Sequence, residues 1–189
     1  MKAPLLRAGA VLVVVVLATS GCEMETDNSE TWRGLQMASE DRCSAYDRDD
    51  YPYPQSVEPL IAARLGGWWS PYDGTVFENR SQSDIEHIVA VSEAHDSGAC
   101  RWGSRRRSEF ARDLDNLTLA TPRLNRFEKR AHDAADWLPE HNRCWFAGRV
   151  LAVRREYDLT IDRREAAALD RVLAGCTAAQ IAMPIRPDP

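Results

Sequence analysis

The sequence predicts an α+β fold, mainly helical, in one domain stapled by disulfide bonds. Three observations support this prediction. The chain has 189 residues, 44% of them hydrophobic and 28% charged, which suits one folded core and excludes a multidomain assembly. Apolar residues recur at helical spacing in several segments, and short strand-like segments lie between them. Four cysteines in the body of the chain form an even set, as expected for a disulfide framework.

The elements expected in chain order are a helix at 57–65, an aromatic turn at 68–74, strands at 75–77 and 83–91, helices at 92–97 and 104–111, a strand at 117–120, and helices starting after Thr121, at Arg143 and at Asp162. Gly66 ends the first helix, because glycine readily adopts the backbone conformation of a helix stop. Thr121 and Pro122 are typical of an N-cap and a first helical position.

The first 21 residues are typical of an export signal. Lys2 and Arg7 precede an apolar run at 8–18, which is shorter than the roughly 20 residues that span a membrane. Thr19-Ser20-Gly21-Cys22 resembles a bacterial lipobox, in which Cys22 would be lipidated and become the new N-terminus. Lipoboxes prefer leucine where Thr19 stands, so cleavage and free secretion stay open as the alternative.

Export divides the chain into a signal peptide at 1–21, a polar tether at 22–35, a folded domain at 36–176 and a flexible tail at 177–189. The protein is then expected on the outer face of the cell membrane, held only by its lipid, or outside the cell. An oxidising compartment agrees with the cysteine count.

With Cys22 set aside for lipid, Cys43, Cys100, Cys144 and Cys176 are expected to form two disulfides. Three pairings are possible, and we favour Cys43–Cys100 and Cys144–Cys176. The second bridge would join two neighbouring helices, and each would contribute about 2 to 4 kcal/mol. The spacing contains no C-x-x-C pair, which argues against structural zinc.

The formal net charge is −5, and it becomes about −7 once Lys2 and Arg7 leave with the signal. The stretch 101–130 has a charge of the opposite sign. It contains nine basic and four acidic residues, which gives a net charge of +5. This composition excludes a protein that packages DNA through its overall charge. It allows one local surface to bind a polyanion. A solvated arginine surface is the simpler interpretation of the same stretch.

The residues that could carry chemistry fall into three short motifs. Glu86 and His87 lie on an expected strand, Asn116 on a turn, and Asn125 and Lys129 on the helix after Pro122. A β-β-α arrangement would bring them together. Glu86 and Asn125 offer hard oxygen ligands that suit Mg²⁺, and neutral His87 can take a proton from water if Asn116 fixes its tautomer.

The order E-H-I-V, D-N-L and L-N-R-x-x-K resembles HNH endonucleases of the ββα-metal (His-Me finger) superfamily, and it is most similar to exported bacterial HNH proteins related to the GmrSD nuclease domain. The motifs span 84–130, within a ββα core at about 75–130. Flanking segments extend the resemblance over most of the mature chain. The sequence differs at two positions, with Glu86 where many members have Asp and Asn125 where the third HNH residue is His.

This resemblance implies a metal-dependent endonuclease that hydrolyses phosphodiester bonds of DNA, with RNA left open. His87 would be the general base and Asn116 the residue that orients it, while Glu86 and Asn125 would hold Mg²⁺, with Mn²⁺ as an alternative. Lys129, the only lysine after the signal, would face the phosphate backbone together with Arg123 and Arg126.

A different class of protein stays open beside this one. A disulfide-stapled lipoprotein could bind an anionic envelope polymer through 101–130 without cleaving it. His95 is interpreted as an exposed helix residue, with a place beside the site as the alternative. The sequence leaves open an inhibitor protein, the biological target and the oligomeric state.

Overall fold

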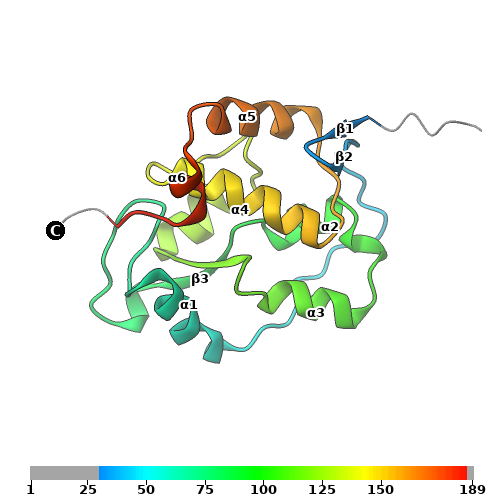
Figure 1. Ribbon diagram of the computed structural model, residues 1–189. Coiled ribbons are helices and arrows are strands. Elements are labelled where there is room, and N and C mark those ends of the chain that lie inside the picture. Colours follow the sequence, from blue (N-terminus) through cyan, green and yellow to red (C-terminus); the bar gives the residue numbers. More distant parts are fainter. Residues whose placement is uncertain (1–29, 187–189) are drawn as a thin grey trace, which may run out of the picture.

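A computed structural model describes residues 30–186 (Figure 1). The expected signal at 1–21 and the lipidation site Cys22 lie outside the described residues. The helices are α1 (Glu58–Leu65), α2 (Val91–Asp96), α3 (Ser104–Arg112), the π-helical η5 (Leu124–Lys129), α4 (Arg143–Glu156), α5 (Arg163–Leu173) and α6 (Ala178–Ala182). The strands are β1 (Thr31–Trp32), β2 (Leu35–Gln36), β3 (Asp84–His87) and β4 (Leu117–Ala120). Short 3-10 turns are η1 (Arg48–Asp50), η2 (Gln55–Val57), η3 (Arg80–Gln82) and η4 (Ala99–Arg101).

The α+β class is confirmed, and the core is centred on α4. Figure 1 shows α4 in the middle of the molecule, with α5 on one side and α1 and β3 on the other. Phe146, Val150 and Val153 of α4 are buried in the main apolar cluster. These residues lie on one face of the helix that was expected to start at Arg143, because a 3.6-residue period aligns them.

β3 and β4 form an antiparallel pair in which Glu86 lies opposite Thr118 and His87 opposite Leu117. Because strand side chains alternate between faces, Ile85 and Leu119 point the same way, and both pack with Ile61 of α1. Glu86 therefore points to the opposite face, toward η5. The 29-residue connection between the strands, 88–116, carries α2 and α3.

Two strand expectations are corrected. The segment 75–77 is not a strand of the sheet, since Val76 makes only an isolated bridge with Trp69. The strand expected at 83–91 ends at His87. Beyond it, the side chain of Asn116 bonds both backbone groups of Val89, taking the hydrogen bonds that a longer ladder would need.

The folded unit also extends beyond the expected boundaries at both ends. β1 and β2 form a hairpin inside the expected tether, and the Trp32 indole donates to Asp170 of α5 at 2.7 Å. The expected tail contains α6, which begins with a capping box at Thr177. Asn142 then exchanges two hydrogen bonds with the backbone of Ile185. Hydrogen bonds therefore attach the tail to the start of α4 as far as Ile185.

Both favoured disulfides are present, Cys43–Cys100 and Cys144–Cys176. The first joins the segment before η1 to η4, and the second joins the start of α4 to the turn after α5. Within residues 30–186, no helix is long and apolar enough to cross a membrane.

Candidate active site

A hollow of about 360 Å³ opens beside the end of β3 and η5. It is lined by Tyr46, Arg48, Glu86, His87, Ala90, Val91, Ser92, Asn125, Arg130 and Ala131. Three of the sequence-predicted site residues, Glu86, His87 and Asn125, therefore meet at one surface depression. Arg48 and Tyr46 come from a segment that the motifs do not include.

His87 is buried to 6% exposure, and its ring makes one hydrogen bond within the described residues, from Nε2 to the carbonyl oxygen of Ala111 at 2.8 Å. A carbonyl oxygen only accepts, so Nε2 carries the proton and Nδ1 keeps its lone pair in the neutral ring. Tyr53 meets the ring edge-on, with centroids 5.1 Å apart, and Phe110 stacks beside it at 6.4 Å. The ring is therefore held in one orientation and one tautomer.

Burial lowers the pKa of His87 to about 3, against the opposing effect of its bond to Ala111. The positive charges of Arg48 and Lys129 lower this pKa further. His87 is therefore neutral near pH 7. A neutral ring is the form that can accept a proton.

Glu86 and Lys129 form a buried ion pair, with 2.7 Å between Glu86 Oε1 and Lys129 Nζ. The two atoms lack the alignment of a hydrogen bond, and Nζ donates instead to the carbonyl oxygen of His87 at 2.9 Å. Burial raises the pKa of Glu86, and the Lys129 ammonium offsets part of that increase. The pair fixes the Glu86 carboxylate at the floor of the hollow.

The expected position of Lys129 is therefore corrected. Its side chain is fully buried, so it does not face a phosphate backbone. The reason is geometric, because η5 turns this residue toward the sheet face that carries Glu86. Lys129 acts on the site through Glu86 and the backbone at His87.

The expected role of Asn116 is corrected as well. Its side chain is completely buried, and it accepts from Val89 N at 2.8 Å and donates to Val89 O at 3.2 Å. The amide has both ends engaged by this backbone, so it does not orient the His87 ring. The carbonyl oxygen of Ala111, at the end of α3, takes that position. A backbone acceptor carries no side-chain signature, so the sequence motifs could not reveal it.

Asn125 presents its amide oxygen without a partner among residues 30–186. Its Nδ2 donates to Asp84 Oδ2 at 3.1 Å and to the Ile85 carbonyl at 3.5 Å. Both partners are acceptors, which fixes the orientation of the amide and leaves Oδ1 free. Asn125 and Glu86 line the same hollow with hard oxygen atoms, and this donor set fits Mg²⁺ or Mn²⁺.

Arg126 and Arg123 were expected to face the phosphate backbone, but both are engaged by carboxylates. Arg126 makes two hydrogen bonds of 2.7 Å to Asp84, and Arg123 pairs with Glu128. Neither residue lines the hollow. Arg48 and Arg130 do, and neither has an ion-pair partner within the described part of the chain. The sequence contains Arg130 in its basic stretch, but nothing in the sequence distinguishes Arg48 from the other arginines.

The basic stretch 101–130 is largely neutralised by carboxylates. Seven of its nine cations form ion pairs, namely Arg101, Arg105, Arg106, Arg107, Arg123, Arg126 and Lys129. In residues 30–186, only Arg112 and Arg130 of this stretch lack such a partner. Of these two unpaired cations, Arg130 lines the hollow.

The sequence of this domain matches a known family, described as GmrSD restriction endonucleases, C-terminal domain, over residues 50–171. The match covers more than half of the chain, from η1 into α5. The chain belongs to this family, and the expectation of a GmrSD-related nuclease domain is confirmed.

A curated relative from Arthroderma benhamiae, named "Uncharacterized secreted protein", is 35% identical over 124 residues. That alignment covers 64% of this chain and 60% of the relative, so the chain spans less than two thirds of the relative's length. No solved structure matches the chain.

Proposed function

We propose that this protein is an exported, metal-dependent endonuclease of the HNH type that hydrolyses phosphodiester bonds, with DNA as its substrate and RNA as a further one to test. The observation that carries the proposal is the arrangement at His87. A neutral histidine with its Nε2 proton held by a backbone carbonyl lies in a hollow with two hard oxygen ligands. Family membership supports the same reaction class.

In the proposed mechanism, His87 Nδ1 accepts a proton from the attacking water, while Ala111 holds the ring in place. Lys129 holds the Glu86 carboxylate in position and favours its ionised form, and Asp84 orients the amide of Asn125. Glu86 and Asn125 would hold Mg²⁺, which supplies charge stabilisation at the scissile phosphate. The Arg130 guanidinium at the rim of the hollow would contact substrate phosphate. The β3–β4–η5 unit is, on this proposal, a ββα-metal core.

The same proposal places the protein outside the cytoplasm. Two disulfides fit an oxidising compartment, and the relative from Arthroderma benhamiae carries "secreted" in its name. Whether Cys22 carries a lipid is tested by metabolic labelling with a fatty-acid analogue, in the parent and in Cys22→Ala.

The proposed function is tested by incubating the purified mature protein with plasmid DNA and Mg²⁺, with and without a chelator. We expect nicking and linearisation that the chelator stops. His87→Ala should reduce the rate by at least about a hundredfold, because a positioned base contributes roughly 10² to 10⁴. The matched control is His132→Ala, an exposed histidine outside the hollow, which should cut as fast as the parent.

Two results would contradict the proposal. If His87→Ala cuts as fast as the parent, this residue is not the base. If the parent never cuts DNA or RNA with Mg²⁺ or Mn²⁺, the endonuclease assignment fails. Unchanged activity in Asn125→Ala would remove that residue from the ligand set while leaving the reaction class intact.

A further inference from the structure

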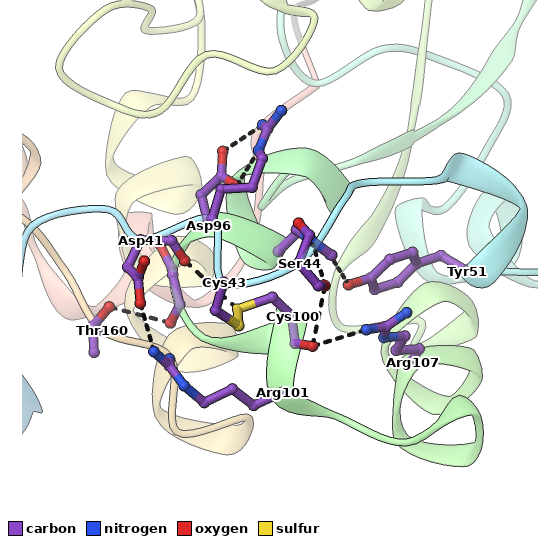
Figure 2. The surroundings of a disulfide bond; sticks show 12 residues. Asp41, Cys43, Ser44, Tyr51, Asp96, Cys100, Arg101, Arg107 and Thr160 are labelled. Atoms are coloured by element: carbon purple, nitrogen blue, oxygen red, sulfur yellow. Dashed lines mark hydrogen bonds and ion pairs between the residues drawn. A yellow bond between two sulfur atoms is a disulfide. The ribbon is translucent and has the colours of Figure 1, made fainter.

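The segment 41–49, here called the arm, lies before the residues that match the family, and it is fastened to the domain along its length. The Cys43–Cys100 disulfide anchors it to η4 (Figure 2). Asp41 pairs with Arg101 at 2.6 Å, and Arg42 pairs with Asp96 at 2.6 Å. The arm is thus a fixed part of the molecule.

His95 of α2 completes this attachment. It is fully buried, which corrects the expectation of an exposed helix residue. Its Nε2 donates to the carbonyl oxygen of Ser44 at 3.0 Å, and its Nδ1 accepts from the Tyr51 hydroxyl at 2.8 Å. Figure 2 shows Ser44 and Tyr51 in the surroundings of the disulfide. Ser44 and Tyr51, which flank Arg48, are therefore both held against α2.

Arg48 follows the arm's anchor and reaches the hollow that contains His87. Its guanidinium lies 4.9 Å from the centroid of the Tyr53 ring, and that ring meets His87 edge-on at 5.1 Å. Nη1 donates to the Tyr51 carbonyl at 2.5 Å, while Nε and Nη2 donate to no residue that the structure describes. The guanidinium is oriented by one bond and one aromatic ring, with its other donors free.

The acidic neighbours of Arg48 are engaged elsewhere. Asp50 pairs with Arg107, and Asp47 accepts from the backbone of Asp49 as the cap of η1. Within residues 30–186, no carboxylate lies within ion-pair distance of Arg48. An exposed, oriented and unpaired guanidinium beside a candidate general base is suited to bind a phosphate, because its planar donors match two phosphate oxygens.

We propose that Arg48 binds a backbone phosphate of the polynucleotide substrate, and that the Cys43–Cys100 disulfide positions it. This inference rests on the proposed function and adds to it a binding residue from outside the matched family domain. It follows that reduction of this cysteine pair weakens substrate binding, because the arm then keeps only its ion pairs and its contacts with His95. The reduced protein would keep His87 and its metal ligands but bind substrate poorly.

The contact is tested with Arg48→Ala, Arg48→Lys and the matched control Arg105→Ala, whose side chain is 91% exposed on α3. Steady-state cleavage of a 20-base-pair duplex should show KM raised about tenfold in Arg48→Ala, with kcat within about twofold. Arg48→Lys should recover part of this loss. The slope of log KM against log salt should become shallower by about one in Arg48→Ala, as expected for one lost phosphate contact. Arg105→Ala should match the parent.

The positioning role is tested by Cys43→Ser with Cys100→Ser, against Cys144→Ser with Cys176→Ser. The first pair should raise KM as much as Arg48→Ala does, and adding Arg48→Ala to it should change KM by less than about twofold. The second pair should leave KM unchanged. If the first protein does not fold, as judged by its melting curve, Asp41→Ala with Arg42→Ala loosens the arm by another route and should give the same rise.

The outcomes separate this inference from the proposed function. If the parent cleaves DNA and Arg48→Ala behaves like Arg105→Ala, the arginine contact is wrong and the nuclease stands. Unchanged KM in both arm-loosening proteins would overturn the positioning role. Fluorescence anisotropy of labelled duplex with the His87→Ala protein measures binding without cleavage. If the parent does not cleave but binding still depends on Arg48, the phosphate contact stands and the nuclease assignment fails.

Discussion

Lys129 and Glu86 form a buried ion pair in which each charge stabilises the other at the candidate site. Both side chains lie at or below 5% exposure, so both ions are largely removed from bulk solvent. Each ion is stabilised mainly by the other, and Lys129 gains a second acceptor in the carbonyl oxygen of His87. Removing one partner leaves an uncompensated charge in a low-dielectric interior. The pair therefore couples the stability of the fold to the position of a proposed metal ligand.

This coupling gives a prediction for stability. Lys129→Met should lower the free energy of unfolding by roughly 3 to 5 kcal/mol, because it leaves the Glu86 carboxylate buried without a counterion. Glu86→Gln combined with Lys129→Met should recover much of this loss. Urea unfolding of the parent, both single variants and the double variant measures the coupling. Additive losses in the double variant would show that the two groups do not stabilise one another.

At the scale of elements, η5 fits the strand beside it through matched spacing. Asp84 and Glu86 lie on one face of β3, because residues two apart on a strand point the same way. Asn125 contacts Asp84, and Lys129, four residues further along η5, contacts Glu86. The helix is widened, with Arg130 N bonded to Asn125 O at 3.2 Å, a five-residue step typical of π-helices.

Arg130 ends this element in a strained backbone conformation. Its φ is 50° and its ψ is −122°, and His132 N closes the turn on Lys129 O. These angles match the first central position of a type II′ turn, which favours glycine. An arginine there indicates that its side chain is retained at some loss of stability, as is common at functional sites. This agrees with its proposed contact with substrate at the rim of the hollow.

Arg130→Gly should therefore separate stability from function. We expect the melting temperature to rise, with roughly 1 kcal/mol gained from the relieved strain. We also expect KM for duplex DNA to rise, because a cation at the hollow is lost. Arg130→Ala is the control, since it removes the charge but keeps the strain. A glycine variant no more stable than the alanine variant would show that the strain is absent.

At the scale of the whole molecule, a buried cation joins α2, α4 and α5. Arg154 is fully buried and contacts Glu93 at 2.7 Å and Glu165 at 2.5 Å. One guanidinium neutralises one carboxylate, so the second is held in an unfavourable environment. Burial raises the pKa of Glu165 to about 7, against the opposing effect of Arg154, and Glu93 and Asp133 raise it further.

This network predicts a pH dependence of unfolding. The folded state binds more protons than the unfolded state between the ordinary pKa of 4.5 and about 7, so stability is lost as pH rises through this window. The contribution of Glu165 to the free energy of unfolding falls by roughly 1.4 kcal/mol for each pH unit in this window. Over the whole window the loss is about 3 kcal/mol. Glu165→Gln lacks this dependence, so its stability relative to the parent should rise across the window. A constant difference in urea unfolding at pH 4.5 and pH 7.5 would contradict the assignment.

Local signals predicted much of the fold. Thr121 caps its helix as expected, Gly66 stops α1 with a φ of 70°, and Asp162 caps α5 through two backbone bonds. These features depend on a few neighbouring residues. The segment 75–77, expected to be a strand, forms only one bridge, between Val76 and Trp69, because the extent of strand pairing depends on tertiary context beyond the local residue pattern.

The sequence predicted only part of the candidate site, because local motifs locate residues but contacts between distant segments decide their partners. The motifs located Glu86, His87 and Asn125, which meet in one hollow. They could not assign the partner of each polar side chain, since Asn116 bonds Val89, Lys129 turns inward, and His95 is buried behind the arm. Side-chain direction depends on which face of each element is covered, and only tertiary packing sets that.

The sequence by itself determined the class of fold, the four cysteines available for two bridges, the family resemblance and the residue types available for chemistry, while the structure selected the favoured pairing among the three possible ones. These depend on composition, local caps and motif order. The tertiary structure decided that Ala111 orients His87, that Lys129 supports Glu86, and that Arg48 joins the site. A backbone acceptor, a buried ion pair and a disulfide-anchored arm arise from contacts between distant segments, so no local pattern records them.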